Sequence, residues 1–105
     1  MSFIIIYITN PNLKTAKKVA AHLLKKKLIA CANIFPIQST YSWKGKVKNA
    51  KEYVAIVKTR HGYWELIKSE VQKIHPYDIP CIMKLEAEAN YEYEKWIHSE
   101  TERKL

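Results

Sequence analysis

Acidic residues are absent from the first half of the sequence. All ten Asp and Glu residues of the 105-residue chain lie from Glu52 onward, whereas ten of its 18 Lys and Arg residues precede that position. The net charge is +8. This imbalance favours an anionic partner, or contact between the basic half of one subunit and the acidic half of another. It is also typical of a solvated, lysine-rich surface.

Glycine, proline and cysteine are scarce as well, with two, four and two residues. Together with a hydrophobic content of 48%, this excludes long disordered regions and predicts one packed domain over residues 1–105. No run of about 18 apolar residues is present, so we expect no membrane span. The first residues lack the basic region and cleavage site of a signal peptide, and we expect a cytoplasmic protein.

Apolar periodicity predicts four strands and three helices. Strands are expected over residues 2–9, 28–47, 47–60 and 80–89, because these segments are apolar, β-branched or alternating. Amphipathic helices are expected over residues 13–27 and 61–74, the second stopped by His75-Pro76. Asn90 is expected to cap a last helix that buries Tyr93, Trp96 and Ile97.

The order β-α-β-β-α-β predicts an α+β, ferredoxin-like fold with an extra C-terminal helix. Its usual strand order is 4-1-3-2, with both main helices on one face of the sheet. This order puts Cys31 and Cys81 at opposite edges, about 14 Å apart across three strand spacings, which is too far for a disulfide within one chain. Contact between Cys31 of one chain and Cys81 of another stays open.

The central hairpin is long for a domain of this size. Residues 30–43 would extend over roughly 46 Å, whereas a compact chain of this length is only about 33 Å across. The hairpin must therefore bend at Pro36, project from the body, or both. Its distal end carries Tyr41 and Trp43, and exposed aromatic residues on an edge strand need cover. We predict that further copies of the chain supply this cover in a closed homo-oligomer.

Two segments resemble those of the CutA divalent-cation tolerance family. ACANIFPIQSTYSWKGKV is similar to the family pattern A-C-A/V-N-I-x-P-x-x-S-x-Y-x-W-x-G-K, and HPYDIP is similar to H-P-Y-x-x-P. The resemblance implies a ferredoxin-like homotrimer that functions in tolerance to divalent metal ions. It also implies copper binding, as proposed for bacterial members, and no enzymatic activity and no required cofactor.

The resemblance also implies where a metal would bind. Bacterial members with a proposed copper site carry a cysteine where this chain has Ile8, and two histidines where it has Ile74 and His75. His75 is therefore the metal-ligand candidate, with Cys31 or Cys81 of a neighbouring chain as a second donor for copper or another divalent cation. Within one chain, the same segment also fits a helix stop followed by an apolar, buried Cys81.

A second hypothesis is a small-ligand pocket between subunits. The resemblance places five residues in family-type segments that strand ends could bring together: Tyr41, Trp43, Lys44, Lys58 and Tyr77. Aromatic walls with lysines beside them suit a small anionic metabolite. Trimeric regulatory proteins of the nitrogen-signalling kind share the architecture and bind nucleotides between subunits, which implies a ligand-sensing role as the alternative.

Other classes with this fold fit the residues less well. RNA-recognition motifs need the K/R-G-F/Y-G/A-F-V-x-F/Y signature on the third strand, and EYVAIVKTR lacks it, so we do not expect a nucleic acid partner. Acylphosphatases need an arginine in the loop after the first strand, and TNPNLKT has none. No nucleophile and base at catalytic spacing can be identified, so we predict that the protein is not an enzyme.

Overall fold

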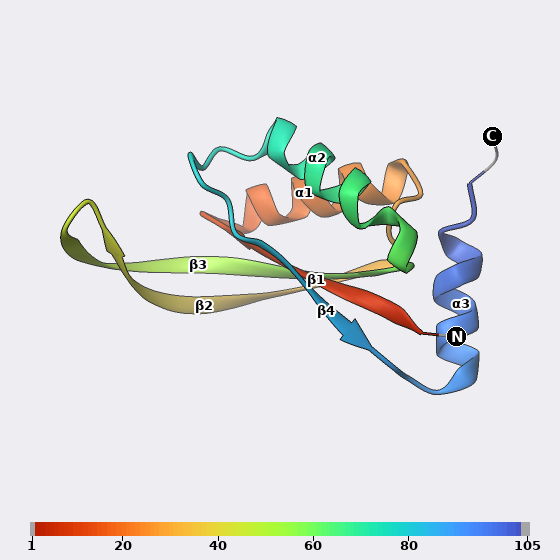
Figure 1. The fold of residues 1–105 in the computed structure, drawn as a ribbon. Helices are drawn as coiled ribbons and strands as arrows, with labels where there is room; N and C mark the ends of the chain where they lie inside the picture. The colour runs from red at the N-terminus through yellow and green to blue at the C-terminus, as the bar shows by residue number, and fades with distance from the viewer. Residues whose placement is uncertain (1, 104–105) are drawn as a thin grey trace.

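A four-stranded antiparallel sheet forms the centre of the molecule (Figure 1). The computed structural model describes residues 2–103. Its strand order, β2-β3-β1-β4, is the predicted one, and the α+β, ferredoxin-like arrangement is confirmed. The elements in chain order are β1 (Phe3–Asn10), α1 (Leu13–Lys25), β2 (Cys31–Trp43), β3 (Lys46–Thr59), the 3-10 turn η1 (His61–Tyr63), α2 (Trp64–Ile74), β4 (Ile82–Ala87) and α3 (Tyr91–Glu100).

Helices α1 and α2 cover one face of the sheet, which we call the covered face. The β-branched run of β1 points Ile4, Ile6 and Ile8 into this layer, and all three are fully buried. Asn12 starts α1 by accepting a hydrogen bond from the Thr15 N–H at 2.8 Å. Helix α1 ends at Lys25, two residues before the predicted end, and α2 is preceded by the 3-10 turn.

The hairpin of β2 and β3 projects beyond both helices and curves as it does so (Figure 1). Its two-residue turn has positive φ at Lys44 (52°) and Gly45 (77°), which is the type I′ geometry that matches strand twist. The pairing of β2 with β3 continues without a shift through Pro36. This proline lies on the edge strand β2, opposite Tyr53 of β3. The molecule is consequently elongated, at 45 × 27 × 21 Å.

Of the helices in residues 2–103, only α3 packs on the opposite face of the sheet, which we call the open face, at the end near Phe3. Strand register places Phe35, Met83 and Leu85 on this face, and all three are exposed. Cys31 opens β2 at one edge and Cys81 directly precedes β4 at the other, and both are unbridged. No helix within residues 2–103 is long and apolar enough to cross a membrane.

The buried face predicted for α3 was partly wrong. Ile97 is buried and Tyr93 is half-buried, but Trp96 is 40% exposed and Glu94 is buried instead. Asn90 is the N-cap residue of α3, as predicted, but its side chain makes no capping hydrogen bond. The Glu94 carboxylate accepts a hydrogen bond from the Ala89 N–H at 2.9 Å.

Candidate functional site

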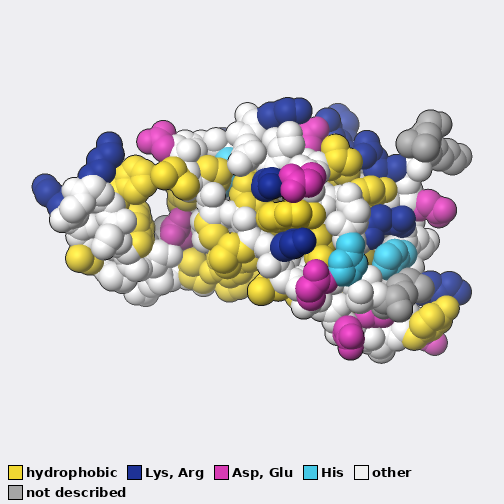
Figure 2. Space-filling model, viewed as in Figure 1, with side chains coloured by type: hydrophobic (Ala, Val, Ile, Leu, Met, Phe, Trp, Pro, Cys, Tyr) yellow, Lys and Arg dark blue, Asp and Glu magenta, His cyan; other side chains and the backbone are white. Residues whose placement is uncertain are grey.

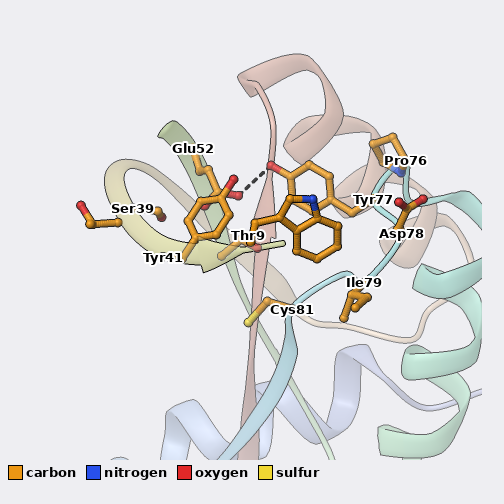
Figure 3. A pocket seen from close by; sticks show the side chains of 11 residues that line it. Thr9, Ser39, Tyr41, Glu52, Pro76, Tyr77, Asp78, Ile79 and Cys81 are labelled. Atoms are coloured by element: carbon orange, nitrogen blue, oxygen red, sulfur yellow. Dashed lines mark hydrogen bonds between the residues drawn. The ribbon is translucent and has the colours of Figure 1, made fainter. Parts of the chain in front are cut away.

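A cleft of about 670 Å³ lies where the distal half of the hairpin faces the segment between α2 and β4 (Figure 3). Strand β2 contributes Tyr41 and Trp43, β3 contributes Glu52, and the connecting segment contributes Tyr77 and Cys81. The remaining lining residues are Thr9, Ser39, Thr40, Pro76, Asp78 and Ile79. In Figure 2, hydrophobic side chains gather where the hairpin meets the body, with acidic side chains beside them.

His75 fixes the path of the connecting segment. It leaves helical geometry at ψ 136°, as expected for a residue before proline, so α2 ends at Ile74 as predicted. Its Nε2 donates to the Thr9 carbonyl oxygen at 2.8 Å, and its Nδ1 accepts from the Tyr77 N–H at 3.2 Å. These partners define the neutral tautomer with the proton on Nε2. His75 thus ties the segment to the end of β1 and places Tyr77 over the cleft.

Glu52 and Tyr77 form the central polar contact of the cleft. The Tyr77 hydroxyl donates to Glu52 Oε2 at 2.6 Å (Figure 3). Glu52 is only 8% exposed. Burial and this contact with Glu52 raise the pKa of Tyr77 above its usual range, so the phenol stays protonated and remains a donor.

Cys81 lies beside this pair. Burial raises the pKa of its thiol, and the negative charge of Glu52 raises it further, while a hydrogen bond with Thr9 acts in the opposite direction. A thiol with a raised pKa is a weak nucleophile at neutral pH, because the thiolate is the reactive form, and a metal bound there would have to displace the thiol proton.

The structure brings together some of the predicted site residues and separates others. Tyr41, Trp43, Tyr77 and Cys81 line the cleft, and His75 supports it from behind. Lys44 does not line the cleft; it lies in the hairpin turn, where its Nζ is 5.7 Å from the centre of the Trp43 ring.

Lys58 and Cys31 lie near α3. The Lys58 Nζ donates to the Tyr93 hydroxyl at 3.1 Å, and the Cys31 sulfur lies 3.4 Å from the same oxygen. Burial and the contact with Cys31 raise the pKa of Tyr93, against a lowering by Lys58. Neither residue lines the cleft, so an anionic ligand there would need basic groups from another subunit.

Sequence reasoning did not place Glu52 or Asp78 in the small-ligand pocket. A signal for Glu52 was present, because alternation along β3 puts positions 52, 54 and 56 on one side of the strand. The acid therefore shares its side with Val54, which is fully buried. Asp78 follows Pro76 in a segment without periodicity, and nothing in the sequence indicated its direction.

The described part of a single chain does not supply a metal site. Within residues 2–103, no three His, Cys, Asp or Glu side chains are gathered closely enough to hold a metal ion. Both ring nitrogens of His75 already have hydrogen-bond partners, so a metal bound there would have to displace one of them. A copper site that uses His75 therefore needs rearrangement and donors from a second chain.

Comparison with known proteins finds a family model and related sequences that name the same family. The family model described as "CutA1 divalent ion tolerance protein" matches residues 4–100. The chain is 43% identical over 101 residues to the divalent-cation tolerance protein CutA of Pyrococcus horikoshii, a match that covers 95% of this chain and 99% of that one.

Solved structures of similar proteins superpose closely. The CutA structure from Archaeoglobus fulgidus, described as a periplasmic divalent cation tolerance protein, has a TM-score of 0.92 at 43% identity and covers 97% of this chain and 100% of its own. CutA1 from Oryza sativa has a TM-score of 0.93 at 34% identity and covers 99% of this chain and 97% of its own.

Proposed function

The chain belongs to the family of CutA1 divalent ion tolerance proteins, and on that premise we propose that it functions in divalent metal tolerance as a non-enzymatic homotrimer. The proposal covers residues 1–105 as one domain. The observation that carries it is the open face of the sheet, where Phe35, Met83 and Leu85 are exposed together with the unpaired edges of β2 and β4. Apolar patches of this kind mark interaction surfaces.

Sedimentation velocity on the purified chain tests the assembly. We expect one species with the mass of three 12.3 kDa chains at micromolar concentration. A stable monomer under those conditions would reject the homotrimer, and a dimer would reject the stoichiometry while keeping the open face as an interface.

Copper is the cation that we propose, held between chains by His75 and a cysteine. Cys81 lies six residues from His75 at the cleft, whereas Cys31 lies on the edge strand β2, so the cysteine that meets His75 depends on the neighbouring chain. Thiolate and imidazole are both ligands that copper accepts. One chain offers too few donors in the described residues, and the proposal therefore depends on the trimer.

Calorimetry with copper tests this site in His75→Ala. His98→Ala is the matched control, because the His98 Nε2 also donates to a backbone carbonyl, that of Ser2 at 2.9 Å, but lies on α3. We expect His75→Ala to lose copper affinity and His98→Ala to keep it. Equal affinity in both variants and the parent would exclude His75 as a ligand.

A cytoplasmic location is part of the same proposal. The Archaeoglobus relative is described as periplasmic, which gives the alternative. Fractionation of cells followed by immunoblotting distinguishes the two compartments.

A further inference from the structure

The cleft carries negative charge in a protein that is strongly positive overall. Glu52 and Asp78 both line it, although the chain has a net charge of +8. Within residues 2–103 the ion pairs involve only Glu65, Glu70 and Glu86, so neither cleft carboxylate has a cationic partner there. A carboxylate as buried as Glu52 is costly without a counter-charge. The cleft is therefore suited to receive a cation, provided that the neighbouring copies that the hairpin contacts leave it open.

Three aromatic rings surround this charge. Tyr41 and Trp43 come from β2 and Tyr77 from the facing segment, and Figure 3 shows Tyr41 and Tyr77 on either side of the Glu52 carboxylate. Aromatic faces attract cations within about 6 Å of the ring centre, and tryptophan attracts them most strongly. The Trp43 ring already takes part in one such contact, with the Lys44 Nζ at 5.7 Å from its centre, although Lys44 does not line the cleft.

The size and donor set of the cleft indicate the kind of cation. Its volume of about 670 Å³ is in the range of small-molecule sites, which is roughly 300–1,000 Å³. A bare divalent ion needs several donors within about 2–2.6 Å of one point, and such a group is not present in residues 2–103. An alkylammonium group needs only ring faces and a carboxylate at longer range, and these are present.

We propose that this cleft binds a small organic cation of the quaternary or tertiary alkylammonium class. Trp43, Tyr41 and Tyr77 form the walls, and Glu52 supplies the counter-charge at the base. Asp78, which is exposed, adds charge at the rim. The alkyl groups of the cation contact the rings, while the Tyr77 hydroxyl keeps the Glu52 carboxylate oriented through its hydrogen bond. This function differs from divalent ion tolerance and does not depend on a metal.

Titration of the full-length protein, in the oligomeric state in which it is purified, tests the proposal. The probe is tetramethylammonium chloride, and tert-butanol serves as a neutral ligand of similar shape. We expect saturable changes in the NMR signal of the Trp43 indole N–H with tetramethylammonium, at least about tenfold weaker changes with tert-butanol, and no dependence on added copper or chelator.

Variants identify the residues that bind. We expect Trp43→Leu and Glu52→Gln each to weaken binding about tenfold, followed in the NMR signals of the cleft backbone, and Asp78→Asn to weaken it a few-fold. Trp96→Leu is the matched control, because Trp96 is a partly exposed tryptophan on α3 outside the cleft, and it should bind like the parent. Asp78 has an exposed side chain, so Asp78→Asn remains informative where Trp43→Leu fails to fold.

Three results would overturn the proposal. Equal affinity for tert-butanol and tetramethylammonium would show that the cleft binds apolar groups and does not favour a positive charge. Unchanged affinity in both Trp43→Leu and Asp78→Asn would place the cation elsewhere. Absence of binding at tens of millimolar probe would show that the cleft is closed, or filled by a side chain of a neighbouring subunit.

Discussion

The two faces of the sheet differ sharply although they share the same strands. On the covered face, Ile4, Ile6 and Ile8 are fully buried beneath α1 and α2. On the open face, Met83 is 48% exposed and Leu85 is 56% exposed. Strand alternation produces both faces from one chain, so the difference arises from what packs on them and not from their hydrophobicity.

This difference assigns subunit stability mainly to the covered face, and contact with other molecules to the open face and the hairpin. The covered face contains the larger cluster of buried residues, which stabilises the subunit by itself. The open face and the projecting hairpin leave apolar surface and a charged cleft available for other molecules. Four substitutions test this division, and we describe them from the largest expected effect to the smallest.

Ile6→Ala should give the largest loss of stability. Ile6 is fully buried on the covered face, and truncation of such a residue costs about 2–5 kcal/mol. Denaturant unfolding measures this, with Val47→Ala as the control from the exposed tip of the hairpin, where we expect less than about 0.5 kcal/mol. Similar costs for the two variants would contradict the view that the covered face holds the subunit together.

Leu85→Asp should weaken association. Loss of one buried leucine side chain costs roughly 1.5–3 kcal/mol per subunit, and a charge placed in an apolar interface adds to this. Sedimentation velocity should show smaller species, with the circular dichroism spectrum retained. Leu66→Asp is the control, because Leu66 is similarly exposed but lies on α2. Dissociation by both variants would mean that the open face is not the specific interface.

Glu52→Gln should make Cys81 more reactive. The charge of Glu52 contributes to the raised pKa of the Cys81 thiol, after burial, so the neutral amide should lower that pKa and increase the thiolate fraction. Alkylation by iodoacetamide, followed by mass spectrometry against pH, should shift to lower pH for Cys81. The rate for Cys31, near α3, is the internal control and should not change.

Glu70→Gln should give the smallest change in stability. Glu70 lies in the helical layer above the covered face. Its carboxylate bridges α1 to α2, with Lys26 at 2.8 Å and His22 at 3.3 Å. Its hydrogen bonds with Lys26 and His22 lower its pKa to about 2 from the ordinary value of 4.5. A lowered carboxyl pKa stabilises the fold above the unfolded-state value, and this contribution is lost as pH falls through the folded-state value.

The corresponding measurement compares urea midpoints of the parent and Glu70→Gln between pH 5 and pH 2. We expect the parent to lose slightly more stability over this window, and the difference to shrink in high salt because these charges are near the surface. A parallel pH dependence in both proteins would show that the bridge contributes nothing measurable.

Much of the fold could be predicted because local patterns were unambiguous. The β-branched run of β1, the helical spacing of Ile67 and Val71, and the stop at His75-Pro76 each indicate one structure. The βαββαβ order then fixes the sheet. Trp96 was assigned to the wrong environment because helical spacing identifies a face, whereas its burial depends on what packs against α3.

The candidate site was predictable only in part. Tyr41, Trp43 and Tyr77 could be grouped because they lie in segments of a recognisable pattern. Lys44 was grouped with them, but it lies in the hairpin turn and does not line the cleft. Its ammonium group contacts the ring of Trp43 instead. The polarity of the cleft comes from Glu52, whose effect depends on burial and on Tyr77, 25 positions away along the chain. Periodicity does not encode such a contact.

The two unpaired strand edges of this sheet are not alike, since one belongs to β2 and the other to β4. Contact between β2 of one copy and β4 of the next is therefore head-to-tail, and it repeats with a fixed rotation at each step. A rotation that returns to its starting point gives a small ring, whereas any other rotation gives an open filament. In such an assembly, the twist and curvature of the long hairpin would help to set that rotation. The geometry of one β-ribbon would then decide between a finite particle and a fibre.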